Sequence, residues 1–324
     1  MGTRVLMDGD WDEHRLEQLR SLLGEDVVLS TDPSGRDYQV LVSGRPDPEL
    51  VNSPGLRCLL IPWAGLPLET RRLMMSHRHI SVHNIHHNAA SAAELALGLI
   101  IAAARRIVVA DSHLRNGDWT PRYLQDSSIL ISGSRILILG YGHLGGRLGE
   151  VCSAMGANVR GIRRSVTRRT VSGSVTLHPP ESLHRLLKDS DIVILSLPLT
   201  DETRGIMGSA ELSLMHENSV LVNVGRGALV DEEALYRSLS TGSIGAAGID
   251  VWYRYPSSRE ERDSTPPSEY PFSELENVVM TPHMGGAFGS ETLERSRTVQ
   301  LADSINAFDH EGKMPFQVDL DRGY

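Results

Sequence analysis

The chain has 324 residues, of which 40% are hydrophobic and 23% are charged, and its formal net charge is -9. This length exceeds what one ordinary hydrophobic core serves, so we expect a globular protein of two lobes. The negative net charge argues against nucleic acid or an anionic membrane as a general partner, although local basic patches can still bind phosphate.

The two cysteines, Cys58 and Cys152, stand outside any metal-ligand spacing. We expect two buried thiols in a reducing compartment, with a single disulfide as the alternative. The first residues, MGTRVLMDGDWDEH, lack the apolar segment of a signal peptide. The most apolar long stretch, residues 89–104, contains Glu94 and is too short to span a bilayer. These features predict a cytoplasmic protein with no membrane partner.

Short apolar segments alternate with a helical segment over about residues 1–85. A strand is expected within RVLMDGD, a Leu-spaced helix at DEHRLEQLRSLLG, and further strands within DVVLS, YQVLVSG, LRCLLIPWAG and HISVHN. Strands that alternate with helices predict an α/β unit with a mostly parallel sheet.

Residues 91–115 predict one long helix, apolar around much of its girth and therefore mostly buried. Between residues 120 and 285, six short apolar segments are separated by helical ones, which predicts a doubly wound sheet of six strands. Residues 256–270, rich in Ser, Pro and Glu, predict a surface loop. The amphipathic segment 291–312 is expected to form a helix that returns to cover the first lobe.

A glycine-rich turn lies between an apolar strand and a helix, in RILILGYGHLGGRLGEVCSAMG. Gly140, Gly142 and Gly145 have G-x-G-x-x-G spacing. The first glycine permits a tight turn, the second lets the backbone approach a pyrophosphate, and the third lets the helix pack on the strand. With His143 and Leu144 at the helix start, this turn predicts a dinucleotide site at a helix N-terminus.

The next strand, ANVRGI, leads into Arg163, Arg164 and Ser165 and has no acidic residue at its end. An acidic residue there would bind the ribose 2′-hydroxyl of NAD, whereas a guanidinium can bind a 2′-phosphate. We therefore predict NADP as the preferred cofactor, with NAD as the alternative and Arg163 as the main determinant. A solvated basic turn is the structural alternative.

Two further residues stand where strands end. Arg226 follows SVLVNVG, and His283 follows NVVMTP. In open α/β sheets the ligand crevice lies outside the carboxyl ends of the strands, so both side chains are expected to enter it. An Arg can pair with a carboxylate, and a His can pass a proton at neutral pH.

Together these segments resemble the D-isomer-specific 2-hydroxyacid dehydrogenases, the superfamily that includes formate, phosphite and phosphoglycerate dehydrogenases. The resemblance covers nearly the whole chain and rests on GYGHLGGRLGEVCSAMGANV, SLPLTDETRGIM, VNVGRGALVDEEAL, GAAGIDVW and ENVVMTPHMGG. It implies a Rossmann nucleotide domain, residues 89–285, inserted in a flavodoxin-like substrate domain, residues 1–88 and 286–324. It also implies a homodimer to which residues 91–115 contribute.

The resemblance also implies roles for single residues. Arg226 would bind the acid group and the reacting oxygen of the substrate, and His283 would exchange a proton with that oxygen. Asp250 would hold the carboxamide of nicotinamide. The other implied cofactor residues are Leu197, Pro198, Val224 and Gly285, and the implied substrate residues are Trp63, Ala64, Gly65 and Asn88. For Asn88, a simple helix-start role is an equal alternative.

One position departs from the family pattern. Most members place a Glu five residues after the Asp that ends the strand, where it pairs with the catalytic His; here that position is Tyr255. A neutral Tyr adds no charge, so we expect His283 to have a lower pKa than in relatives with Glu, and Tyr255 is counted among the catalytic residues. The alternative is that Glu260 or Glu261 swings in to pair with His283.

The sequence thus predicts an NADP- or NAD-dependent oxidoreductase acting on a small anionic substrate, either a 2-hydroxy acid/2-oxo acid pair or a hydroxyalkylphosphonate-like anion. The alternatives are a nucleotide-sensing corepressor of the same fold and an inactive scaffold. His83, His86 and His87 have a spacing that suggests a metal, but no carboxylate accompanies them, so no metal site is predicted.

Overall fold

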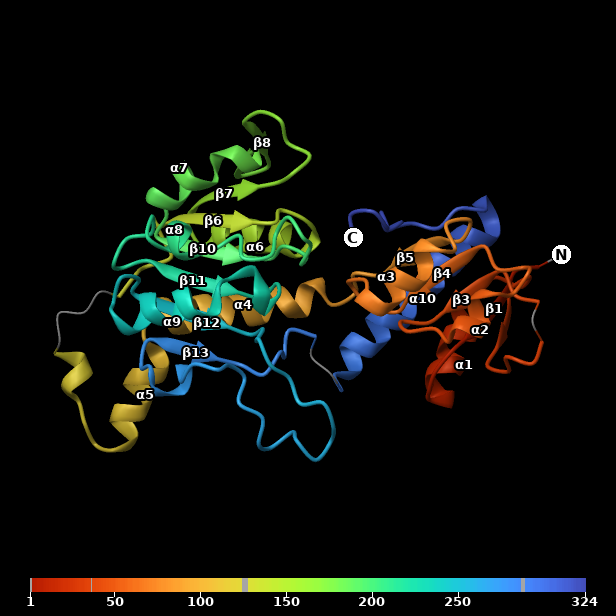
Figure 1. The fold of residues 1–324 in the computed structure, drawn as a ribbon, viewed down its shortest axis with the longest axis horizontal. Helices are drawn as coiled ribbons and strands as arrows, with labels where there is room; N and C mark the ends of the chain where they lie inside the picture. Colours follow the sequence, from red (N-terminus) through yellow and green to blue (C-terminus); the bar gives the residue numbers. More distant parts are fainter. Residues whose placement is uncertain (1, 36, 124–127, 287–288) are drawn as a thin grey trace. The chain divides into compact units, whose positions relative to one another are not determined.

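The computed structural model describes residues 2–35, 37–123, 128–286 and 289–324. The chain divides into two compact units. Unit 1 comprises Met1–Asn88 and Ala287–Tyr324, and unit 2 comprises Ala89–Gly286. Figure 1 shows the fold of both units.

Unit 1 contains a parallel five-stranded sheet in the order β2-β1-β3-β4-β5. This order is that of flavodoxin-like sheets. The strands are β1 (Arg4–Met7), β2 (Val28–Ser30), β3 (Val40–Val42), β4 (Cys58–Ile61) and β5 (Ser81–Asn84), and the helices are α1 (Glu13–Leu22), α2 (Pro48–Val51), α3 (Leu68–Met75) and α10 (Glu291–Glu311).

The last helix of the chain completes unit 1. Leu301, Ile305 and Phe308 of α10 pack with Leu16 and Leu19 of α1 on one face of the sheet. A second cluster, which includes Met74 of α3, covers the other face. The expectation that the amphipathic segment 291–312 covers the first lobe is therefore confirmed.

Unit 2 contains an eight-stranded sheet in the order β13-β12-β11-β10-β6-β7-β9-β8, and Figure 1 shows its strands stacked from β13 to β8. All neighbouring strands are parallel except β8 and β9, which are antiparallel. The strands are β6 (Arg135–Leu139), β7 (Asn158–Ile162), β8 (Thr170–Ser172), β9 (Val175–His178), β10 (Ile192–Leu195), β11 (Val220–Asn223), β12 (Ala246–Ile249) and β13 (Val278–Met280).

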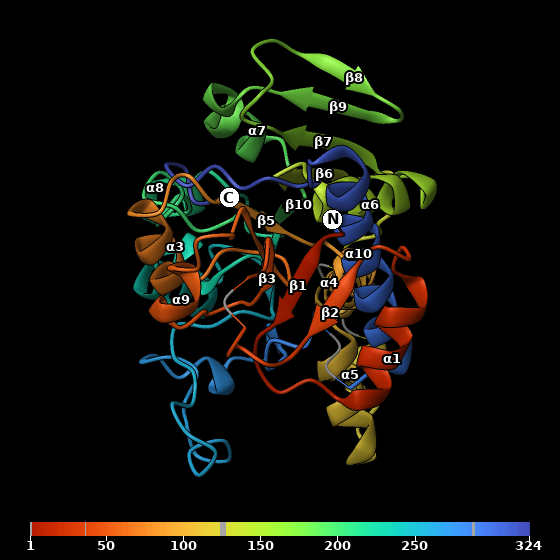
Figure 2. The same cartoon turned by 90° about the vertical axis from the view of Figure 1, so that its right-hand side faces the viewer.

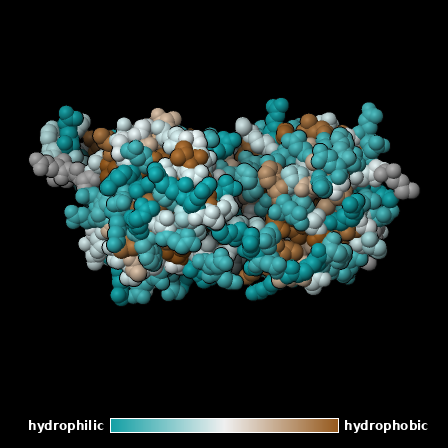
Figure 3. Space-filling model, turned by 90° about the horizontal axis from the view of Figure 1, so that it is seen from above, coloured by the Kyte–Doolittle hydropathy of each residue, from teal (hydrophilic) through white to brown (hydrophobic). Residues whose placement is uncertain are grey.

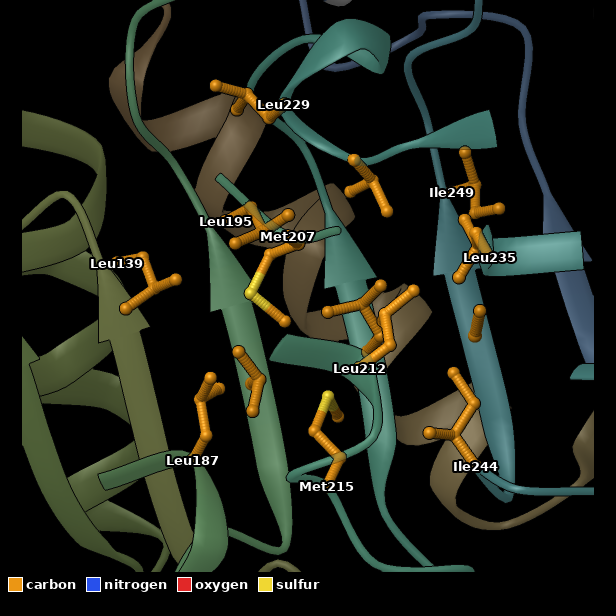
Figure 4. Close-up of a cluster of buried hydrophobic side chains, with 14 of the residues drawn as sticks. Leu139, Leu187, Leu195, Met207, Leu212, Met215, Leu229, Leu235, Ile244 and Ile249 are labelled. Atoms are coloured by element: carbon orange, nitrogen blue, oxygen red, sulfur yellow. The ribbon is translucent and has the colours of Figure 1, made fainter. Parts of the chain in front are cut away.

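Helices cover both faces of this sheet. They are α4 (Ala89–Ala104), α5 (Ile107–Arg115), α6 (His143–Ala154), α7 (Leu183–Lys188), α8 (Ser209–Leu212) and α9 (Glu232–Ser240), with short 3-10 turns at Thr120–Arg122, Pro180–Ser182, Gly227–Leu229 and Phe272–Glu274. One core cluster joins α4 and α6 to the strands. The other, drawn in Figure 4, joins α7, α8 and α9 to the opposite face. This is the doubly wound α/β arrangement expected from the sequence.

Two expectations about unit 2 were wrong. The single helix over residues 91–115 is two helices, because Arg106 adopts the left-handed conformation (φ 51°) and ends the first one. None of the residues of α5 is buried, whereas six residues of α4 are. The hairpin of β8 and β9 was missed. It lies at the upper edge of the sheet in Figure 2, and both strands are short, with all three residues of β8 exposed.

The cysteines and the surface bear on the expectations for disulfides and membranes. Cys58 and Cys152 are free and buried, as expected. On the face shown in Figure 3, hydrophobic residues are scattered among hydrophilic ones. Within the described residues, no helix is both long and apolar enough to cross a membrane.

Candidate active site

The glycine-rich turn joins β6 to α6 as the spacing predicts. A Cβ atom on Gly140 (φ +99°) would lie 2.8 Å from the Leu197 nitrogen, and one on Gly145 would lie 2.3 Å from the Gly140 oxygen. A Cβ on Gly142 would meet no protein atom within 4 Å. The surrounding backbone therefore requires glycine at positions 140 and 145. The space where a Gly142 side chain would lie is open, so a bound group can approach the backbone closely there.

The start of α6 faces the same space. The first N–H groups of a helix have no acceptor within the helix and carry its positive dipole, so they favour an anion. His143, Leu144 and Gly145 form this first turn. Burial and the nearby Arg163 lower the pKa of His143, so its imidazole is neutral at pH 7 while Arg163 supplies the positive charge. The residues present fit a dinucleotide pyrophosphate.

Arg163, Arg164 and Ser165 are exposed directly after β7. The turn is held by two backbone bonds: the Arg163 N–H donates to the His178 oxygen (3.2 Å), and the Val166 N–H donates to the Arg163 oxygen (3.0 Å). The Gly140 and Tyr141 N–H groups donate to the oxygen of Ile162 (3.2 and 3.1 Å), the residue directly before Arg163. The structure thus brings the basic turn and the glycine-rich turn together.

Leu197 and Pro198 follow β10 in a braced loop. The Thr203 hydroxyl donates to the Pro198 oxygen (2.7 Å) and accepts from the Thr200 N–H (2.8 Å). Leu197 is partly buried against the core cluster beneath α7, α8 and α9. Val224, which follows β11, is partly buried against the cluster beneath α4 and α6. These apolar residues could line the nucleotide side of the strand ends.

Asp250 ends β12 and is 2% exposed. Its Oδ1 accepts from the Thr281 hydroxyl and from the Met284 N–H, both at 2.7 Å, and its Oδ2 accepts from the Gly285 N–H at 3.0 Å. A Cβ on Gly285 would lie 3.2 Å from that Oδ2. The carboxylate therefore organises the turn that carries His283, a role that the sequence interpretation did not assign to it. Thr281 is a further participant that sequence reasoning missed.

His283 itself sits in this turn with φ +57°, a left-handed conformation that is rare for a non-glycine residue. Burial and the positive charge of Arg226 lower the pKa of His283, and the charge of Asp250 opposes them only in part. The imidazole is therefore predominantly neutral at pH 7. The comparison with Glu-bearing relatives stays a prediction.

Arg226 follows β11, and Asn223 positions it. The Asn223 Nδ2 donates to the Arg226 oxygen (2.9 Å), while its Oδ1 accepts from the Gly225 N–H (3.2 Å). The Arg226 guanidinium donates to the Gly225 oxygen (2.6 Å). The pKa of Arg226 is lowered because nearby protein removes part of its hydration, yet a guanidinium stays charged at neutral pH. Asn223 was missed, although its place at the strand end in VNVGRG is the signal that could have found it.

Tyr255 lies beside His283, with ring centroids 5.6 Å apart and planes tilted by 56°. Its hydroxyl oxygen accepts from the Trp252 N–H (3.0 Å), so its own proton remains available to a second acceptor. Burial raises the pKa of Tyr255, which keeps the phenol neutral. Glu261, in contrast, accepts from the backbone and hydroxyl of Ser257 within the exposed loop, so its carboxylate is engaged away from the imidazole.

The candidate substrate residues Trp63, Ala64, Gly65 and Asn88 belong to unit 1. The first three are partly buried in the loop after β4, where Gly65 has φ +93°. A Cβ on Gly44 would lie 1.8 Å from the Trp63 ring, so this ring packs directly on backbone. Asn88 is partly buried in the turn before α4.

Two of the three histidines with metal-like spacing have other partners. His83 bonds to the Pro315 oxygen (2.9 Å) and to the Ser81 hydroxyl (3.0 Å), and His86 packs edge-on against Phe316. Across the part of the chain that the structure describes, no group of three His, Cys, Asp or Glu residues could hold a metal ion.

Comparison with known proteins agrees with this geometry. Residues 97–285 match the family model described as D-isomer specific 2-hydroxyacid dehydrogenase, NAD binding domain. The chain belongs to this family. The D-isomer-specific 2-hydroxyacid dehydrogenases share the two-domain α/β fold with a Rossmann-like nucleotide-binding domain.

Two relatives within the family illustrate the similarity. The chain is 36% identical over 228 residues to a glyoxylate reductase of Aeropyrum pernix. The aligned stretch covers 69% of this chain and 64% of that protein. It is 33% identical over 215 residues to a D-3-phosphoglycerate dehydrogenase of Methanocaldococcus jannaschii, over 66% of this chain and 38% of that protein. The matched stretch thus spans between about two fifths and two thirds of the length of these relatives.

Solved structures of the family share the fold over the whole chain. A D-isomer-specific 2-hydroxyacid dehydrogenase of Xanthobacter autotrophicus, in complex with NADPH and MES, has a TM-score of 0.80 at 24% identity and covers 100% of both chains. An NADPH-dependent glyoxylate/hydroxypyruvate reductase of Sinorhizobium meliloti, in complex with NADP and sulfate, has a TM-score of 0.77 at 23% identity and covers 99% of this chain and 100% of that one.

Proposed function

We propose that the protein is an oxidoreductase that uses a nicotinamide cofactor to interconvert a small 2-oxo acid and its 2-hydroxy acid. The observation that carries this proposal is the joint placement of Arg226, His283 and Tyr255 at the carboxyl ends of neighbouring strands. Asn223 and Asp250 hold the backbone of the first two. The glycine-rich turn lies in the same unit, at the carboxyl end of β6.

The two units take separate roles in this proposal. Unit 2 binds the cofactor, and the bound cofactor supplies or accepts the hydride. Unit 1 contributes Trp63, Ala64, Gly65 and Asn88 to substrate binding. The backbone N–H groups of the loop after β4 would receive the substrate carboxylate.

Arg226 binds the acid group and polarises the reacting oxygen, because its guanidinium stays charged and keeps donors beyond the bond to Gly225. His283 gives a proton to that oxygen during reduction and takes it back during oxidation. Tyr255 keeps its hydroxyl proton for a neighbouring acceptor, either the imidazole or the substrate, and adds no negative charge. The lowered pKa of His283 favours the base form at neutral pH.

Arg163 sets a preference for NADP in this proposal, because it directly follows Ile162, whose oxygen accepts from the N–H groups of Gly140 and Tyr141 in the glycine-rich turn. An Arg163→Gln variant would then lose efficiency with NADPH and keep it with NADH. Arg237→Gln is a matched control that removes a surface guanidinium from α9, away from the turn after β7. Equal efficiency of the unaltered protein with the two cofactors would contradict the preference.

The protein is proposed to act as a homodimer through α5. Ile107, Val108 and Leu114 of this helix are 48%, 50% and 50% exposed, and large apolar side chains on one short helix favour coverage by a partner surface. Light scattering of Val108→Asp should show a lower mass than the unaltered protein. A monomer in both cases would contradict the dimer.

The decisive experiment measures NADPH oxidation with a panel of 2-oxo acids, including glyoxylate and hydroxypyruvate, and with phosphonate analogues. Steady turnover is expected with at least one acid and should fall by about 100-fold or more in His283→Asn. Tight NADPH binding without turnover of any member would instead favour a nucleotide-sensing protein of the same fold.

A further inference from the structure

A basic pocket lies in unit 2, on the edge hairpin of the sheet. It has a volume of about 330 Å³ and is lined by Arg160, Arg169, Thr176, His178, Arg185 and Leu186. We call it the hairpin pocket. Figure 2 shows its elements β7, β9, β8 and α7 together at one edge of the sheet.

The strand register explains why these side chains share one face. Arg160 on β7 is paired with Thr176 on β9, and His178 follows two residues later, so all three point to the same side. Arg185 belongs to α7, which covers this side with Leu186, while Val175 and Leu177 point into the opposite core cluster. Arg169 directly precedes β8.

Positive charge is in excess in the hairpin pocket. Arg160 donates to the Asp189 backbone oxygen (2.6 Å) and to Ser190 (3.2 Å), and the Asp189 carboxylate lies 3.9 Å away. In the described parts of the chain, neither Arg169 nor Arg185 forms an ion pair with any carboxylate. The pocket therefore gathers three guanidinium groups against one partly exposed acid.

His178 supplies a second, independent observation. It is only 5% exposed, yet its imidazole has no hydrogen-bond partner among the residues that the structure describes. The ring nitrogens of His178 are not among the fully buried atoms that lack a partner, so they remain accessible from the pocket that His178 lines, where a ligand can bond them. The three arginine side chains line the same pocket as this ring, and after burial their charges lower the pKa of His178.

We propose that the hairpin pocket is a second anion site, which binds the phosphate group of a small phosphorylated metabolite. Guanidinium groups bind phosphate with paired, charge-assisted hydrogen bonds, and the imidazole can donate or accept one more. The volume falls in the range of small-molecule sites and leaves room for a short carbon skeleton beside the phosphate.

The hairpin pocket is distinct from the cofactor turn. At one end of the pocket, the Arg160 guanidinium reaches Asp189 and Ser190, which precede β10 at the amino edge of the parallel sheet. The other end borders the basic turn, because the Arg163 N–H donates to the His178 oxygen (3.2 Å). The pocket lies on the face of the sheet that α7 covers, whereas α6, which follows the glycine-rich turn, covers the opposite face. A ligand there would leave the glycine-rich turn free for the dinucleotide.

Calorimetric titration of the full chain with inorganic phosphate and with glycerol 3-phosphate, at constant ionic strength and with saturating NADPH, tests the proposal. We expect saturable binding to one site, tighter for glycerol 3-phosphate. Arg169→Gln and Arg185→Gln should each weaken it by about ten-fold, because each removes a charge-assisted contact. Arg237→Gln should leave it unchanged.

Three results would overturn the proposal. They are the absence of saturable binding by the unaltered protein, an equal loss in Arg237→Gln, and binding of the phosphate compound only when NADPH is omitted. The last would assign the pocket to the cofactor, and a matching rise in KM for NADPH but not for NADH in Arg169→Gln would identify it as part of the 2′-phosphate site. Circular dichroism and thermal unfolding verify that each variant is folded.

Discussion

The Asp250 carboxylate accepts the Met284 N–H at 2.7 Å, and it thereby holds the backbone of the residue directly after His283. The same carboxylate also bonds Thr281 and Gly285, so it spans both sides of the imidazole-bearing turn. A buried acid that bonds three donors is fixed in place, and it can orient a neighbouring catalytic group without touching the substrate.

Replacing Asp250 by Asn should impair the reaction more than it impairs the fold. The amide keeps the size of the side chain but loses the charge and presents donors to N–H groups, so the turn that orients His283 should shift. We expect kcat to fall by about 100-fold. Thr281→Val, which removes only one of the three bonds, should lose about ten-fold or less. Similar turnover of Asp250→Asn and the unaltered protein would contradict the positioning role.

Replacing Tyr255 by Glu should move the pH profile. Reduction needs protonated His283, so its rate falls as the pH rises through the pKa of this group, which now lies below the ordinary value near 6.5. A carboxylate beside the imidazole favours its charged form, so the descending limb should shift by about one pH unit upward. Tyr255→Phe is the control, and it should change the rate with little shift of the limb.

Two glycines of the cofactor turn should respond differently to Ala. At Gly145 the added Cβ would meet the Gly140 oxygen at 2.3 Å, so Gly145→Ala should lower the free energy of unfolding by about 1–3 kcal/mol. At Gly142 the Cβ meets no protein atom within 4 Å, so the fold should be retained. The KM for the dinucleotide should rise by about ten-fold or more in Gly142→Ala if the pyrophosphate approaches there. Thermal unfolding and cofactor titration measure the two effects, and an unchanged KM would place the pyrophosphate elsewhere.

His87 should make unit 1 sensitive to acid. Burial, together with the charges of Arg297 and His86, lowers its pKa to about 4, and its Nδ1 is buried without a hydrogen-bond partner. The unfolded chain takes up a proton near pH 6.5, whereas the folded chain does so only near pH 4, so stability is lost as the pH falls between these values.

A neutral replacement isolates this effect. His87→Gln should remove about 1–3 kcal/mol of the pH dependence of unfolding between pH 6.5 and 4. Denaturant unfolding across that range measures it. His79→Gln, at a more exposed histidine of unit 1, serves as the comparison, and identical pH slopes for the two variants would contradict the assignment.

Local patterns predicted much of this protein because they depend on neighbours in the sequence. Short apolar segments placed the five strands of unit 1 and six of the eight strands of unit 2. The glycine spacing placed the turn before α6, since backbone geometry alone demands Gly140 and Gly145. The break at Arg106 was not predictable in this way. Nearby residues such as Ala104 and Ile107 are compatible with a helix. Nothing in the local composition indicates that Arg106 adopts the left-handed conformation.

The sequence by itself determined the family, the nucleotide-binding fold and the residue types at the strand ends, because strand periodicity and turn chemistry are local properties. Only the tertiary structure decided how those residues combine. It brought Asp250 to the turn of His283 across separate strands, engaged Glu261 in its own loop, and gathered His178 and three arginines around one pocket. These relationships depend on strand order and on which side chains share a face, and both are settled only when the sheet assembles.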